Sequence, residues 1–161
     1  MTGIDLRAKV REVPDFPTPG VGFKDITPML ADPASLQEAI DQLAGWVRAK
    51  QPDIVLGAEA RGFLLGPAVA AAAGCGFVPA RRPGKLPPTT ISATYALEYG
   101  EDEVEIHLDA IRPGESVLVV DDLIAPGGTA EAAIKLLRQA GANVVGAAFV
   151  IDLPDLGGAA R

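Results

Sequence analysis

The feature that most constrains the fold of this chain is the segment from Val117 to Ala130, Val-Leu-Val-Val-Asp-Asp-Leu-Ile-Ala-Pro-Gly-Gly-Thr-Ala. An apolar run that ends in polar residues and a glycine-rich turn is typical of a buried parallel strand followed by a helix. A helix N-terminus offers unpaired amides and the positive end of its dipole, and glycines let the backbone approach an anion closely. We therefore predict a phosphate site at Gly127, Gly128 and Thr129.

The rest of the chain alternates short apolar runs with helical patterns. We expect strands at 54–56, 77–80 and 144–151, a further strand that begins at Val117 and runs into Asp121 and Asp122, helices at 4–11, 32–50, 62–73 and 129–140, and an antiparallel hairpin at 91–108. Residues 13–20 contain three prolines and a glycine and are predicted to be irregular. Strands that alternate with helices predict the α/β class, a mostly parallel twisted sheet flanked by helices, with ligands outside the carboxyl ends of the strands.

Length and composition exclude several classes of protein. The 161 residues suit one domain of about 150 residues, and 48% of them are hydrophobic, which is enough for one core. A net charge of −7 without a block of Lys or Arg argues against a nucleic-acid or anionic-membrane partner. The single cysteine and single histidine exclude a disulfide framework and the common Cys/His zinc sites. The chain shows neither the apolar core of a signal peptide nor a run of about 20 apolar residues, so we expect a cytoplasmic protein.

Two adjacent acids, Asp121 and Asp122, precede the predicted phosphate site. They would repel a phosphate that touched them, but carboxylates accept hydrogen bonds from a sugar diol and attract a magnesium-bound ligand. A phosphate and a diol together indicate a ribose 5-phosphate. No Gly-Lys-Ser/Thr follows, so the segment is not a P-loop, and in isolation the two glycines could serve only to reverse the chain.

Five segments in the same order along the chain carry a resemblance to a known family. They are Asp15-Phe-Pro-Thr-Pro-Gly-Val-Gly-Phe-Lys-Asp-Ile-Thr-Pro28, Glu59-Ala-Arg-Gly-Phe63, Pro83-Gly-Lys-Leu-Pro87, Leu97-Glu-Tyr-Gly100 and the Asp-Asp segment above. The last resembles the phosphoribosyl-diphosphate signature of type I phosphoribosyltransferases, and all five together resemble the adenine phosphoribosyltransferase family.

The resemblance implies an activity, a fold and partners. The family transfers ribose 5-phosphate from phosphoribosyl diphosphate to adenine with Mg²⁺, giving AMP and pyrophosphate, and its members are homodimers. It implies one phosphoribosyltransferase domain over 1–161, with a small hood formed by about 1–33 and the C-terminal end, and a flexible flap over about 82–107.

The resemblance also implies residue roles. Catalytic roles fall to Arg61 and Lys85, which balance the charge of the leaving pyrophosphate, and to Glu98, which shuttles a proton to or from the purine. Phosphoribosyl diphosphate is expected to contact Asp121, Asp122, Ala125, Gly127, Gly128, Thr129, Arg81 and Arg82. Adenine is expected between the backbone of Gly22 and Lys24, the ring of Phe23, and Leu153. No side chain is assigned as a metal ligand, and Asp121 and Asp122 are the candidates.

Two departures from the family pattern leave alternatives open. Pro126 stands where the family usually has threonine, which removes an amide and a hydroxyl from the phosphate loop. The chain also ends at Arg161, where the resemblance leads us to expect a further strand or helix. A sensor that binds phosphoribosyl diphosphate or a nucleotide without turnover is one alternative. A transferase for another base is the second, although no basic residue that would read a 6-oxo group can be placed.

Overall fold

The computed structural model describes the chain except for residues 1–2, 97–99, 125–127, 154, 156 and 159–161. It divides into two compact units, Met1–Gln42 and Leu43–Arg161, and the boundary falls inside helix α2. Among the described residues, no helix combines the length and the apolar character needed to cross a membrane.

The first unit holds a small antiparallel sheet and short helices. Its elements are η1 (Arg7–Lys9), β1 (Arg11–Val13), β2 (Phe23–Asp25), α1 (Thr27–Ala31) and the first part of α2 (Pro33–Lys50). The predicted helix over 4–11 is wrong, because only a 3₁₀ turn forms there before Arg11 pairs with Asp25 across the sheet. These three-residue strands are too short to show a period of two in the sequence. Helix α2 begins as predicted, with the Asp32 carboxylate accepting the Ser35 amide at 3.3 Å.

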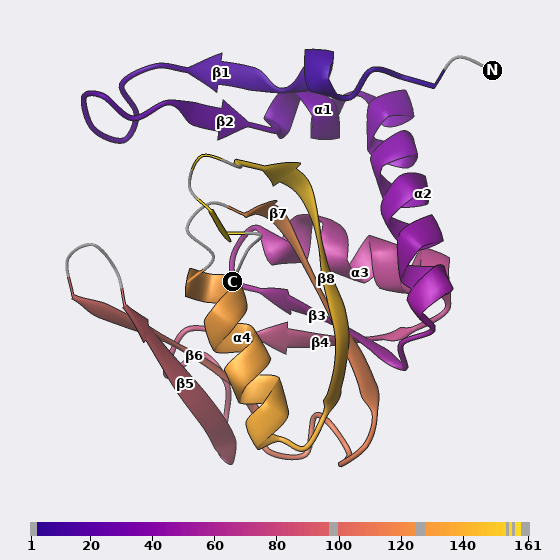
Figure 1. Ribbon diagram of the computed structural model, residues 1–161, viewed down its shortest axis with the longest axis vertical. Helices are drawn as coiled ribbons and strands as arrows, with labels where there is room; N and C mark the ends of the chain where they lie inside the picture. The colour runs from indigo at the N-terminus through magenta and orange to yellow at the C-terminus, as the bar shows by residue number, and fades with distance from the viewer. Residues whose placement is uncertain (1–2, 97–99, 125–127, 154, 156, 159–161) are drawn as a thin grey trace. The chain divides into compact units, whose positions relative to one another are not determined.

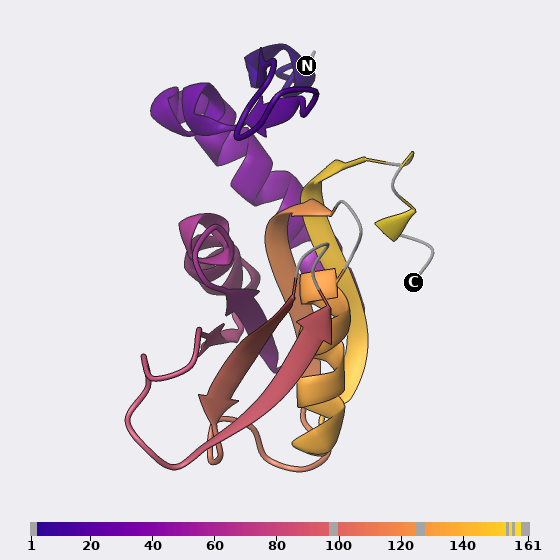
Figure 2. The same ribbon diagram turned by 90° about the vertical axis from the view of Figure 1, so that its left-hand side faces the viewer.

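The second unit is built on a four-stranded parallel sheet in the order β4-β3-β7-β8. Its elements are β3 (Ile54–Ala58), α3 (Gly62–Ala73), β4 (Gly76–Ala80), β7 (Ser116–Ile124), α4 (Gly128–Gln139) and β8 (Asn143–Asp152). The chain crosses from β3 to β4 in one direction along the sheet and from β7 to β8 in the other. Because such crossovers are right-handed, α3 and α4 cover opposite faces, as Figures 1 and 2 show. The predicted fold class is confirmed.

Strand β7 lies at the centre of the hydrophobic core. Its residues Val117 to Val120 are at most 2% exposed, as the continuous apolar run in the sequence predicts for a strand buried on both faces. Strand β4 forms one edge of the sheet, a position that accommodates Pro79, which has no amide to donate.

The predicted hairpin is confirmed as a separate two-stranded sheet, β5 (Thr90–Ala96) and β6 (Glu101–His107). Its apolar side chains Ala93, Val104 and Ile106 join the same core cluster as Leu136 of α4. The hairpin lies beside α4 in both views (Figures 1 and 2). An isolated antiparallel bridge between Arg81 and Glu105 also connects it to the chain that leaves β4.

Candidate active site

The sheet has one topological switch point, between β3 and β7, where the two crossovers diverge. Ligands of open α/β sheets bind in the crevice outside the carboxyl ends of the strands at such a point. Arg61 follows the end of β3, and the Asp121–Asp122 pair lies near the end of β7. The topology therefore brings together three of the residues predicted from the sequence to form the site.

Close packing of Gly62 sets the position of Arg61. A Cβ atom added at Gly62 would lie 3.1 Å from the carbonyl carbon of Gly57 and 3.3 Å from the carbonyl oxygen of Val120. The first turn of α3 thus lies directly against the backbones of both β3 and β7, so close that a Cβ atom at Gly62 would force these backbones apart by a few tenths of an ångström. Arg61, the residue before this turn, places its Nη1 atom 3.3 Å from Oδ2 of Asp122.

The two acids of β7 lie in different environments. Asp122 is 2% exposed, whereas Asp121 is only partly buried and accepts the Asp122 amide at 2.8 Å through Oδ1. Burial raises the pKa of Asp121 to about 7, the negative charge of Asp122 adds to this rise, and Arg61 opposes it. At neutral pH Asp121 therefore populates both protonation states, and it can either donate a hydrogen bond to a hydroxyl or accept one.

The raised pKa of Asp121 predicts how stability depends on pH. Between about pH 4 and pH 7 the native chain binds a proton at Asp121 that the unfolded chain has lost, so this group lowers stability as pH rises through that window. We expect Asp121→Asn, which cannot ionise, to raise the free energy of unfolding by at most about 4 kcal/mol at pH 8 and by little at pH 4. Urea unfolding at both pH values measures this, with Asp109→Asn as the control that removes an exposed carboxylate. An equal effect of Asp121→Asn at both pH values would contradict the assignment.

The predicted phosphate turn is partly described. Gly128 is the first residue of α4 and Thr129 the second, so the amides of the first turn of this helix lie just beyond the end of β7. Ala125, Pro126 and Gly127 lie outside the described residues. The unpaired amides at the start of a 12-residue helix suit an anion.

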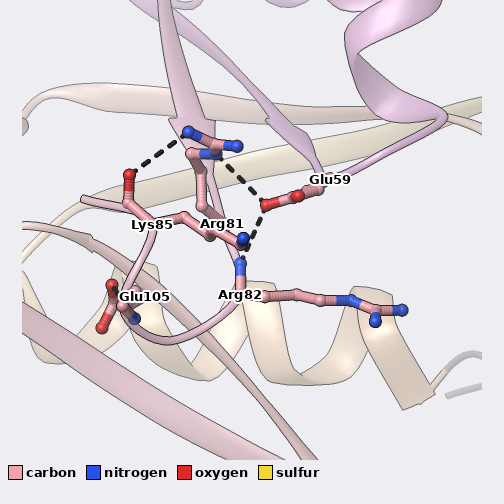
Figure 3. A network of polar contacts seen from close by, with 6 residues as sticks. Glu59, Arg81, Arg82, Lys85 and Glu105 are labelled. Atoms are coloured by element: carbon pink, nitrogen blue, oxygen red, sulfur yellow. Dashed lines mark hydrogen bonds and ion pairs between the residues drawn. The ribbon is translucent and has the colours of Figure 1, made fainter.

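The predicted cations Arg81, Arg82 and Lys85 surround a carboxylate that the sequence interpretation did not single out, Glu59 (Figure 3). Oε2 of Glu59 accepts the Arg82 amide at 3.1 Å and Nε of Arg81 at 3.2 Å. The Arg82 amide is the largest cause that lowers the pKa of Glu59, followed by the Arg81 side chain. Nη1 of Arg81 also donates to the Lys85 carbonyl at 3.2 Å, so Arg81 is engaged in holding the loop. The side chains of Arg82 and Lys85 are exposed.

A second carboxylate, Glu105 of β6, fixes the same loop from the other side. It is 8% exposed and accepts the Gly84 amide at 3.1 Å and the Thr90 hydroxyl at 3.3 Å. In the sequence, Glu105 stands between two apolar residues, Val104 and Ile106, and the structure buries all three. This position was the one sequence signal that could have indicated a buried carboxylate. The loop that presents Lys85 is thus attached to both β3 and the hairpin.

The residues predicted to contact adenine fall in different units of the chain. Gly22 precedes β2, and Phe23 and Lys24 lie in it. Phe23 packs edge-on against Phe16 with ring centroids 5.1 Å apart, and Lys24 pairs with Glu12 at 2.8 Å. In the second unit, the Leu153 amide donates to the Ile124 carbonyl at 3.0 Å. The predicted catalytic acid–base Glu98 lies outside the described residues.

Comparison with known proteins identifies the class to which this fold and crevice belong. Residues 28–159 match the family model of the phosphoribosyl transferase domain. The chain is 59% identical over 157 residues to an adenine phosphoribosyltransferase of Rhodopseudomonas palustris, covering 98% of this chain and 87% of the relative. It is also 59% identical to the enzyme of that name from Bradyrhizobium diazoefficiens, covering 98% of this chain and 88% of the relative.

Solved structures agree with these relatives. The adenine phosphoribosyltransferase of Rhodothermus marinus superposes with a TM-score of 0.90 at 51% identity, over 97% of this chain and 89% of the other. That of Saccharomyces cerevisiae, crystallised with an imino-altritol bisphosphate and adenine, gives a TM-score of 0.91 at 41% identity, over 97% and 91% of the two chains. The chain belongs to the phosphoribosyl transferase family, and within it to the adenine phosphoribosyltransferases.

Proposed function

We propose that this chain catalyses purine salvage, transferring ribose 5-phosphate from phosphoribosyl diphosphate to adenine to form AMP and pyrophosphate. The observation that carries the proposal is the Arg61–Asp122 pair at the switch point of the sheet, with the first turn of α4 following the same strand. The names of the relatives and the bisphosphate and adenine in the yeast structure support it.

Three groups of residues each bind one part of the substrate in this proposal. The amides of Gly128 and Thr129 at the start of α4 bind the 5-phosphate, and Asp121 and Asp122 bind the ribose hydroxyls. Arg61, Lys85 and Arg82 bind the diphosphate, whose negative charge grows as its bond to the ribose carbon breaks and a purine nitrogen bonds there instead. Arg61 suits this task because its guanidinium is fixed by a buried carboxylate while its side chain remains 45% exposed.

Magnesium fits the donor chemistry of this crevice as a partner of the substrate. Mg²⁺ favours oxygen ligands and is usually held by one or two carboxylates together with substrate phosphates. Within the described part of the chain no three Asp, Glu, His or Cys residues form a metal cluster, so Asp121 and Asp122 would hold the ion only together with the diphosphate. When bound, it neutralises charge on the leaving group.

The remaining proposals rest on the family resemblance. The backbone of Gly22 and Lys24 reads the adenine edge, the Phe23 ring stacks on the base, and Leu153 closes the pocket. Glu98 transfers the purine proton. The chain works in the cytoplasm as a homodimer, within a single domain in which about 1–33 and the C-terminal end form the hood and about 82–107 form the flap.

The experiment that tests the function is a mass balance. Incubation with radiolabelled adenine, phosphoribosyl diphosphate and Mg²⁺ should convert adenine to AMP with release of one pyrophosphate for each AMP. A sensor would bind phosphoribosyl diphosphate and raise its own melting temperature without forming either product, and that outcome would overturn the proposal.

A further inference from the structure

Glu59 lies between the two segments that carry the cations proposed to bind the diphosphate. It directly follows β3 and stands two residues before Arg61. Its amide donates to the Ala80 carbonyl at 2.8 Å, so its backbone extends the pairing of β3 with β4 by one residue. Its side chain, which is 19% exposed, is directed at the loop that leaves β4 (Figure 3). Glu59 therefore connects the backbone of the sheet to this loop through its carboxylate.

The loop over residues 81–85 has four amides, because residue 83 is proline, and all four donate to acceptors in the protein. Two of them donate to backbone carbonyls. The other two donate to the carboxylates of Glu59 and Glu105, which reach the loop from the ends of different strands or from within them. The Glu59 carboxylate accepts both the Arg82 amide at 3.1 Å and Nε of Arg81 at 3.2 Å. The conformation of the loop thus depends on Glu59 at two successive residues.

The contacts of Glu59 fix the chain at the points from which the proposed diphosphate ligands project. Arg81, which Glu59 holds, donates in turn through Nη1 to the Lys85 carbonyl at 3.2 Å. The guanidinium of Arg82 is directed away from Glu59, although the Arg82 amide is bound to it (Figure 3). The Arg82 amide, followed by the Arg81 side chain, lowers the pKa of Glu59. The carboxylate is therefore ionised at neutral pH and accepts charge-assisted hydrogen bonds.

We propose that Glu59 is a positioning residue for the diphosphate, holding the loop over residues 81–85 so that Arg82 and Lys85 bind the same leaving group as Arg61. This inference rests on the proposed function. The proposal also fixes the sign of the effect. Through charge alone, removing a carboxylate near a diphosphate would strengthen binding, because like charges repel. Positioning predicts weaker binding instead, because without Glu59 the cations of the loop have to be ordered when the ligand binds.

The test is the Kd of pyrophosphate with Mg²⁺, measured by calorimetry without turnover. We expect Glu59→Ala to weaken this Kd roughly tenfold, the loss of a hydrogen bond to a charged group, and to leave the Kd of ribose 5-phosphate within about twofold of wild type. Glu59→Gln keeps an oxygen that can accept the Arg82 amide, so its Kd of pyrophosphate should fall between the two. An unchanged or tighter Kd of pyrophosphate in folded Glu59→Ala would overturn the proposal.

Asp53→Ala is the matched control for a purely structural role. Oδ2 of Asp53 accepts the Ser116 amide at 2.8 Å next to the opposite, amino end of β3, so this variant also removes a carboxylate that holds a neighbouring backbone. We expect both alanine variants to lower the free energy of unfolding, and only Glu59→Ala to weaken pyrophosphate binding. An equal loss of pyrophosphate binding in both would mean that Glu59 merely stabilises the fold, which would overturn the proposal.

A double-mutant cycle shows whether Glu59 acts through the cations of the loop. Replacing Arg82 and Lys85 together with methionine should weaken pyrophosphate binding, and Glu59→Ala added to this variant should weaken it no further. A further tenfold loss would mean that Glu59 acts independently of these two cations, and it would overturn the proposal.

These binding measurements separate the inference from the proposed function. If the wild type binds pyrophosphate but forms no AMP, the proposed function fails, and the ratio of the two Kd values still decides the role of Glu59. If the wild type forms AMP and Glu59→Ala binds pyrophosphate as tightly as wild type does, the inference fails and the proposed function stands. Absence of pyrophosphate binding by the wild type would also overturn the assignment of Glu59.

Discussion

Replacing Arg61 with glutamine is expected to lower kcat/KM for phosphoribosyl diphosphate by roughly 100- to 1,000-fold, the range seen when one preorganised donor to a developing charge is removed. Arg61 is held at the switch point by the close packing of Gly62 and by its pair with Asp122. The neutral amide cannot offset the charge of the leaving diphosphate. Steady-state kinetics with saturating adenine measure the loss.

Two further variants show whether this loss belongs to the site. Arg61→Lys keeps the charge but loses the planar fork that contacts a phosphate through two atoms, so it should fall between Arg61→Gln and wild type. Arg48→Gln removes an exposed arginine that donates to the Ala72 carbonyl near the other end of α3, and it should retain full activity. Arg61→Gln that folds normally and stays within threefold of wild type would refute the role of Arg61.

Asp122→Asn has the second largest expected effect, a loss of roughly 10- to 100-fold in kcat/KM for phosphoribosyl diphosphate. This is the range for one hydrogen bond to a charged group, here from Asp122 to a ribose hydroxyl. The same change should lower the pKa of Asp121, because the charge of Asp122 is one cause of its rise. Kinetics measure the first effect, and the pH dependence of unfolding measures the second.

Stability separates a role in binding from a role in folding at this buried position. Asparagine has nearly the shape of aspartate, so we expect the free energy of unfolding of Asp122→Asn to change far less than its activity. The control is Glu115→Gln, which removes a negative charge just before the amino end of β7, opposite the site. Wild-type activity in Asp122→Asn, or an equal loss in Glu115→Gln, would show that the acid pair has been misinterpreted.

The second unit was predictable because its signals are local. The apolar run Val117–Val120 specifies a strand, and the glycine after α3 specifies a helix end. The turn from the Asp-Asp pair to the glycines specifies a strand–helix junction. Each of these signals lies within a few residues. Gly74 adopts a positive φ of 78° at the C-cap of α3, the conformation in which a glycine commonly ends a helix. Positions at the carboxyl ends of parallel strands then follow from topology, which is why the acid pair could be predicted from its pattern, whereas Arg61 was predicted from the family resemblance.

The parts that sequence analysis missed depend on pairs of residues far apart in the chain. Strand β1 exists because Arg11 pairs with Asp25, 14 residues away, and its own sequence carries no strand pattern. The roles of Glu59 and Glu105 could be recognised only from the folded structure, in which both contact the loop at Arg81.

The whole account depends on the claim that the base is adenine. The most direct test measures the rate of nucleotide formation with adenine, hypoxanthine and guanine in parallel, each with phosphoribosyl diphosphate and Mg²⁺. The account predicts AMP from adenine, with kcat/KM at least about 100-fold above either 6-oxopurine, since a site built for one set of hydrogen bonds leaves polar groups unpaired with the other. Faster turnover of hypoxanthine or guanine, or no turnover of any base by the folded protein, would contradict it.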